Sequence, residues 1–144
     1  MIGIITNNID SLDLDEINRE SGKDDITIFH DNVNPSIRYE NISSMSKHSS
    51  YDFRGDIITT CLLSCSFTLK NPSCDKIVFW PHAVEWYQWN SFFYSELKEI
   101  IMSDKIKILC TDKDVAKVYT DMFRKPDLYI DSFDINLLKE KLLC

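Results

Sequence analysis

Glycine is scarce in this chain. Only Gly3, Gly22 and Gly55 occur among 144 residues, and they are too far apart to form a glycine-rich phosphate loop. Neither G-x-G-x-x-G nor G-x-x-x-x-G-K-[ST] is present. Their absence disfavours dinucleotide cofactors and P-loop chemistry, because both depend on backbone N–H groups that closely approach a phosphate. We therefore expect no cofactor.

A disulfide framework and a membrane span are also missing. Five cysteines form an odd set without a C-x-x-C pair, namely Cys61, Cys65, Cys74, Cys110 and Cys144. Such a set favours reduced, structural thiols and a cytoplasmic location. No apolar run approaches the roughly 20 residues that a membrane helix needs, and no basic leader follows Met1. We expect a protein that is neither secreted nor bound to a membrane.

Positive charge is in short supply as well. The formal net charge is −7, and residues 10–25 contribute seven carboxylates against two cations. This stretch repels phosphate backbones, and no basic run compensates for it, so no nucleic-acid partner is expected. The acidic stretch is typical of the solvated face of a helix; the alternative is a docking surface for a basic partner.

Short apolar runs alternate with amphipathic segments along the chain. Strands are predicted at 2–6, 26–29, 56–60, 75–79, 105–110 and 128–130, and helices at 11–20, 61–70, 90–102, from Asp112 or Asp114 to Pro126, and from Ser132 or Asp134 through Leu142. Because each parallel step needs a crossover, this order predicts an α/β fold in which about six mostly parallel strands carry helices on both faces. Residues 1–144 are expected to form a single Rossmann-like domain. Residues 35–54 allow two interpretations, a long binding loop or an element hidden by an irregular pattern.

The segment KIVFWPHAVEWYQW (76–89) carries the strongest functional signal, because a buried-type strand runs directly into a loop that holds all three tryptophans. Ligands of open α/β sheets bind beyond the carboxyl ends of the strands. His82 is the candidate catalytic base or hydrogen-bond donor, and the candidate ligand-binding residues are Trp80, Glu85, Trp86, Trp89, His30 and Thr60. The alternatives are that His82 is an ordinary loop histidine and that the indoles pack in the core or against a protein.

Two further kinds of chemistry receive less support. His30 and Asp31 could join His82 around a divalent metal if their strands were neighbours, but their spacing matches no ligand pattern and no metal site is predicted. Cys61 and Cys65 lie at a predicted strand-to-helix junction without a G-x-S-x-G elbow. Structural thiols are favoured there over a catalytic cysteine.

Residues 56–138, read in order, resemble the N-terminal domain of GT-B glycosyltransferases. The matching segments are DIITTCLLSC, KIVFWPHAVEW and KIKILCTDKDVAKVYTDMFRKPDLYIDSFDINLL. The resemblance implies a Rossmann-like domain and a sugar nucleotide as substrate. The chain departs from the family where Thr6, Asn7 and Asn8 replace the first glycine-rich loop, and where Asp131 to Asp134 replace the usual Asn-Gly turn. It also stops where the donor-binding second domain, with its E-x-x-x-x-x-x-E carboxylates, would begin.

These observations together favour a stand-alone glycosyltransferase-like domain that acts as a non-catalytic or accessory binding protein through the strand-end aromatic loop. Its expected partner is another protein or a second copy of itself, and its candidate ligand is a glycosyl or nucleotide compound. One alternative is a glycosyltransferase active only as an oligomer or with a partner chain. A second is a small viral-type regulator or virion component, suggested by the small size and the Asn/Ile/Lys/Asp-rich usage.

Overall fold

One parallel sheet organises the molecule. The computed structural model describes residues 1–6, 12–20, 25–30, 42–71, 76–82, 84 and 94–143. Within these ranges the strands are β1 (Ile2–Ile5), β2 (Ile26–His30), β3 (Ile42–Ser46), β4 (Asp56–Thr59), β5 (Ile77–Phe79), β6 (Ile106–Cys110) and β7 (Leu128–Tyr129). They form a seven-stranded sheet in the order β3-β2-β1-β4-β5-β6-β7, and every neighbouring pair is parallel. The predicted α/β class is confirmed, with one strand more than the six expected.

The strand order reverses beside β1. From β1 the chain moves outward through β2 to β3, and it then returns to the other side of β1 to build β4 through β7. In the register, Ile5 pairs with Phe29 on one side and with Thr59 on the other. The gap between β1 and β4 is therefore the topological switch point, which is where open α/β sheets bind their ligands.

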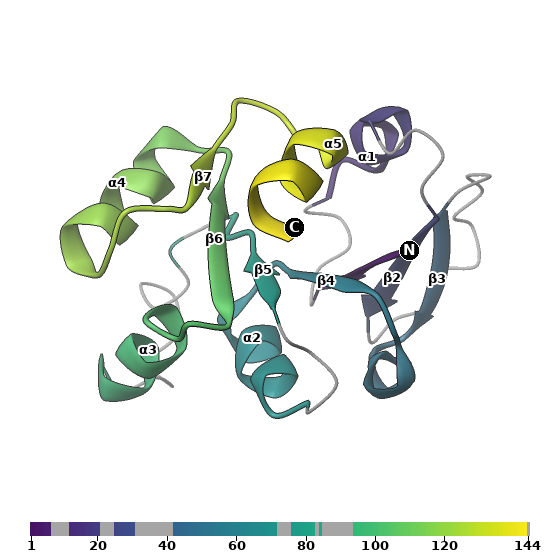
Figure 1. Cartoon of the computed structure of the whole chain (residues 1–144), viewed down its shortest axis with the longest axis horizontal. Coiled ribbons are helices and arrows are strands. Elements are labelled where there is room, and N and C mark those ends of the chain that lie inside the picture. The colour runs from purple at the N-terminus through teal and green to yellow at the C-terminus, as the bar shows by residue number, and fades with distance from the viewer. Residues whose placement is uncertain are drawn as a thin grey trace.

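Helices cover both faces of the sheet. They are α1 (Leu14–Glu20), a 3-10 turn η2 (Lys47–Asp52), α2 (Leu62–Leu69), α3 (Tyr94–Ile101), α4 (Lys113–Met122) and α5 (Ile135–Leu138), which runs into a π-helical turn η4 (Lys139–Leu143). In Figure 1, α1 and α5 lie above the sheet, and α2 and α3 lie below it. No helix in the described ranges is long and apolar enough to cross a membrane.

Alternation along each strand divides the core into two clusters, because successive side chains of a strand point to opposite faces. Ile5, Phe29 and Phe79 belong to the cluster beneath α2, α3 and α4. Ile4, Ile28 and Val78 belong to the cluster beneath α1 and α5. We call these sides the α2 face and the α1 face. The strands read as continuous apolar runs because both faces are buried.

Residues 42–52 contain the element that the sequence pattern concealed. β3 is an edge strand with the sequence ISSMS, and only its Ile42 is buried. Exposed positions at a sheet edge do not require apolar side chains, so β3 lacks the pattern by which the other strands were predicted. Of the two interpretations of residues 35–54, the hidden element is correct for 42–52, whereas residues 35–41 lie outside the described part of the chain.

Gly3 is explained by close packing on the α2 face. A Cβ atom at Gly3 would lie 3.0 Å from Phe29 Cε2 and 3.0 Å from Phe53 Cε1. These two rings meet edge to face with their centroids 5.3 Å apart. Phe53 follows η2 in the connection from β3 to β4. Because Gly3 has no side chain, this connection can lie directly on β1.

Arg124 joins three segments near the start of β6. Its Nε donates to the Ile101 carbonyl at 2.9 Å, and its Nη2 donates to the Ile106 carbonyl at 2.8 Å. Its Nη1 donates to Asp127 Oδ2 at 2.8 Å, and the same oxygen accepts the Ile108 N–H at 2.8 Å. The guanidinium group thus ties the end of α3 to β6 and to the turn before β7.

We expect Arg124→Gln to lower the free energy of unfolding by about 1–3 kcal/mol, because charge-assisted bonds to partly buried acceptors are lost. The matched control is Lys117→Gln. Lys117 forms a 3.7 Å ion pair with Asp121, but the two side chains are 78% and 63% exposed. That substitution should change stability by about 0.5 kcal/mol or less. Urea denaturation of both variants measures the difference, and equal effects would contradict a stabilising role for the Arg124 contacts.

Candidate functional site

Four side chains form a row across the carboxyl ends of the central strands. The backbone ladder continues one residue past the strands, since Thr6 N–H donates to the Phe29 carbonyl (3.0 Å), Thr60 N–H to Ile5 (3.1 Å) and Trp80 N–H to Thr59 (2.8 Å). His30, Thr6, Thr60 and Trp80 therefore follow one another from β2 to β5. By strand alternation all four lie on the α1 face. We call them the strand-end row.

The centre of the row spans the switch point. The Thr60 hydroxyl donates to Thr6 Oγ1 at 2.8 Å, which links the end of β4 to the end of β1. Both threonines are buried. Thr60 was a predicted ligand-binding residue, whereas Thr6 was named as the end of the predicted strand 2–6 and as part of a replaced glycine loop, without a binding role. Its position directly after the first buried strand is the signal that could have identified it.

His30 closes the row on the β2 side. Its Nε2 lies 2.8 Å from the Ser44 hydroxyl on β3, and the side chain is buried. β1 and β4 separate its strand from β5, which corresponds to about 14 Å at the usual strand spacing. His30 and His82 therefore do not follow neighbouring strands, which was the condition for a shared metal. Asp31 lies outside the described residues, and the described ones include no group of three His, Cys, Asp or Glu residues able to hold a metal ion.

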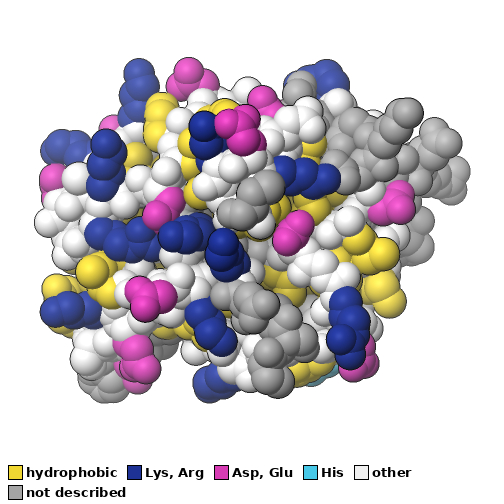
Figure 2. Space-filling view, in the orientation of Figure 1, with side chains coloured by type: hydrophobic (Ala, Val, Ile, Leu, Met, Phe, Trp, Pro, Cys, Tyr) yellow, Lys and Arg dark blue, Asp and Glu magenta, His cyan; other side chains and the backbone are white. Residues whose placement is uncertain are grey.

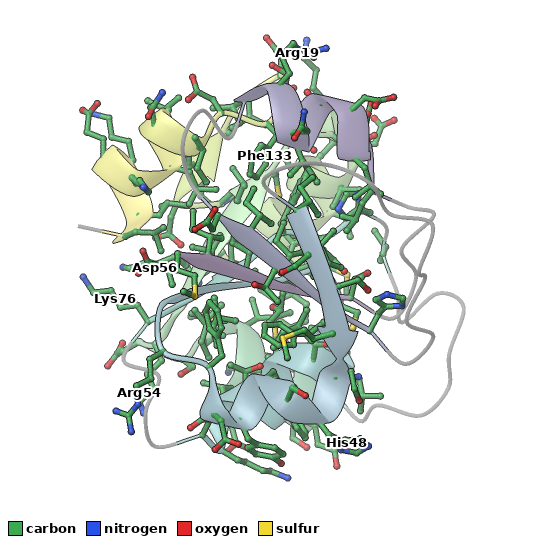
Figure 3. The ribbon with its side chains drawn as sticks, turned by 90° about the vertical axis from the view of Figure 1, so that its right-hand side faces the viewer. Arg19, His48, Arg54, Asp56, Lys76 and Phe133 are labelled. Carbon is green, nitrogen blue, oxygen red and sulfur yellow. The ribbon has the colours of Figure 1, made fainter. Side chains whose placement is uncertain are left out.

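Trp80 closes the row on the β5 side and is packed rather than open. Only 4% of the residue is exposed. Its ring stacks on Phe133 at a centroid distance of 5.2 Å and an interplanar angle of 28°, and Nε1 donates to Thr111 Oγ1 at 3.0 Å. Phe133 lies on the α1 side of the sheet in Figure 3. Stacking on a ligand would require these neighbours to move, so a ligand-binding role for Trp80 stays a prediction.

His82 lies against Trp80, with ring centroids 4.4 Å apart and planes tilted by 45°. Its Nε2 is buried and has no hydrogen-bond partner in the described part of the chain. Desolvation by burial lowers the pKa of the imidazole, so the ring is neutral at neutral pH. A neutral imidazole nitrogen accepts or donates one hydrogen bond according to its tautomer, and Nε2 has this capacity unused.

The remaining predicted site residues, Glu85, Trp86 and Trp89, lie outside the described residues. Whether they join Trp80 and His82 stays a prediction. Two neighbours of Trp80 were missed by sequence reasoning. Thr111 follows β6 directly, as Thr6 follows β1, whereas Phe133 comes from the Asp131–Asp134 turn, which was considered only for its departure from Asn-Gly.

The thiols of two cysteines near the row contact neighbouring hydroxyl groups of the fold. Cys65 Sγ lies 2.8 Å from Thr59 Oγ1, and Cys61 Sγ lies 2.9 Å from Ser64 Oγ. Burial and the negative charge of Asp112 raise the pKa of the Cys110 thiol to about 12. Cys110 is therefore protonated at neutral pH, whereas a catalytic cysteine needs its thiolate form.

Comparison with known proteins gives no assignment: no family model, no curated protein and no solved structure matches this chain. The resemblance to the N-terminal domain of GT-B glycosyltransferases remains an expectation from the sequence. The function is therefore argued from the site itself.

We expect His82→Gln to change the pH dependence of stability. Because the folded pKa of His82 lies below its unfolded value of about 6.5, the unfolded chain binds more protons as the pH falls. The native protein should lose stability from about pH 6.5 downward through the folded pKa, and His82→Gln should lose less over this window. Thermal unfolding between pH 8 and pH 5 measures the difference; parallel curves would contradict the burial of this imidazole.

Proposed function

We propose that this chain is a non-catalytic, glycosyltransferase-like binding protein that holds a sugar or nucleotide compound at the strand-end row. The observation that carries the proposal is the hydroxyl pair of Thr6 and Thr60, which lies at the β1/β4 switch point. This is the position at which sheets of this strand order bind their ligands.

The chemistry of the row suits a ligand rich in hydroxyl groups. His82 Nε2 is buried without a partner in the described part of the chain, and such a group gains free energy when a ligand supplies the missing bond. A sugar hydroxyl can form a hydrogen bond with Nε2 in either tautomer of the ring, because a hydroxyl group both donates and accepts. The neutral state of His82 favours such a neutral group over a bare anion.

The proposal assigns no catalytic step, because the described groups near the row lack the arrangement of an activated nucleophile. Cys110 is held as a thiol, and Cys65 is hydrogen-bonded to Thr59. An activated nucleophile needs a base within hydrogen-bond reach, and a third group usually orients that base. His82 Nε2 has no hydrogen-bond partner in the described ranges, neither a nucleophile nor an orienting group.

We expect UDP-glucose, UDP-N-acetylglucosamine or GDP-mannose to bind saturably, with no release of nucleoside diphosphate. Calorimetry and tryptophan fluorescence measure binding, and a coupled assay for the diphosphate measures turnover. His82→Gln should weaken binding about threefold to tenfold, as expected for one lost hydrogen bond, with an unchanged melting temperature at pH 7.5.

The matched control is His48→Gln, since His48 is an exposed residue of η2 remote from the row. It should leave binding unchanged. Absence of binding by all three compounds would refute the proposed ligand class. Turnover, by the chain alone or with a partner, would show a transferase rather than an accessory protein.

A further inference from the structure

Helix α2 carries apolar side chains on two sides. Leu62, Cys65 and Thr68 are buried toward the sheet. Leu63, Ser66, Phe67 and Lys70 are separated by three or four positions and form a second stripe along the helix. The sheet needs only the first of these sides, so the leucine and phenylalanine of the second stripe are not explained by the core.

The second stripe forms one wall of a groove, and η2 forms the other. The groove is lined by Lys47, His48, Tyr51, Leu63, Ser66, Phe67 and Lys70, and it has a volume of about 420 Å³. The Tyr51 and Phe67 rings lie 4.4 Å apart at an angle of 54°. Tyr51 and Leu63 are each 47% exposed, so the groove is open to solvent. We call it the α2–η2 groove.

This groove is separate from the strand-end row. It lies on the α2 face, whereas the row and Phe133 lie on the α1 face. In Figure 3, His48 and Phe133 appear on opposite sides of the sheet. Binding in the groove is therefore independent of binding at the strand-end row.

The charges around the groove have one sign. Among the described residues, two lysines and one histidine line it and no carboxylate does, although the formal net charge of the chain is −7. Basic and acidic side chains are interspersed over the face shown in Figure 2, so the net charge does not prevent local basic areas. A second groove on the α3 side of α2 provides a contrast, because Glu96 and Glu99 line it beside Lys70. Of these two grooves, the α2–η2 groove is the one that combines exposed aromatic surface with positive charge alone among its described lining residues.

We propose that the α2–η2 groove docks an acidic peptide segment of a partner protein, which inserts one large apolar side chain between Tyr51, Leu63 and Phe67. The carboxylates flanking this anchor lie beside Lys47 and Lys70. An open groove cannot enclose a small compound, and small-molecule sites bury most of their ligand. A peptide instead buries one anchor residue and leaves the rest of its length on the surface.

The test uses the full chain and a dye-labelled synthetic peptide with one phenylalanine between two triplets of glutamate. Fluorescence anisotropy should show saturable binding that weakens as salt rises, because exposed charges are screened. Leu63→Ser should raise the Kd about tenfold by removing apolar contact area. Lys70→Glu should raise it about threefold to tenfold by reversing one charge.

Two variants outside the groove serve as matched controls. Met102→Ser removes an apolar side chain that is also 47% exposed, and Lys98→Glu reverses an exposed charge on α3. Neither should change the Kd of the peptide. A peptide with serine in place of phenylalanine should bind at least tenfold more weakly, which separates anchoring from charge attraction. Thermal melting checks that all four variants remain folded.

Three outcomes would overturn the proposal. The first is no saturable binding at millimolar peptide, and the second is equal binding of the serine peptide. The third is a dimer, seen by analytical ultracentrifugation, that Leu63→Ser dissociates; a second copy would then occupy the groove. A failure here leaves the sugar-nucleotide measurements unaffected, because those depend on His82 and the opposite face.

Discussion

Burial of both faces of one parallel sheet is the constraint on which the rest of this structure depends. It requires apolar side chains at successive positions of β1, β2, β4 and β5, because side chains on both faces of these strands are shielded from water. It also requires a covering layer on each side, which α1 and α5 provide on one face and α2, α3 and α4 on the other. Gly3 shows how closely these layers pack, because the Phe53 ring lies on β1 where a side chain at position 3 would otherwise be.

Several buried polar side chains lie where the central strands end, and most of those in the strand-end row have a partner there. Thr60 bonds to Thr6, His30 approaches Ser44, and Trp80 bonds to Thr111. A buried polar atom without a partner costs free energy, so such pairing is the general rule in folded proteins. His82 Nε2 departs from this rule within the described residues, at the edge where ligands of such sheets bind. This unsatisfied atom is one reason for proposing the edge as a binding site.

Much of the fold was accessible from the sequence, because apolar runs such as IGII and IVF are too short for helices and alternate with helical segments, which indicates buried strands. The prediction missed β3, whose ISSMS sequence reflects an exposed sheet edge instead of a core. The candidate site was predicted less completely. His30 ends β2, whereas Thr60 and Trp80 directly follow β4 and β5, so their place at strand ends was predicted from the sequence, but their alignment in one row depends on register. The packing of Trp80 against Phe133 joins residues more than fifty positions apart. Local patterns contain neither kind of information.

Helix α2 has a further consequence for how the protein meets other molecules. Ser66 and Lys70 line the grooves on both sides of this helix. An acidic guest in the α2–η2 groove would therefore engage an ammonium group that also lies beside Glu96 and Glu99 in the second groove. Its binding would change the charge balance of the second groove, and the two sides of α2 would be coupled without any movement of the backbone.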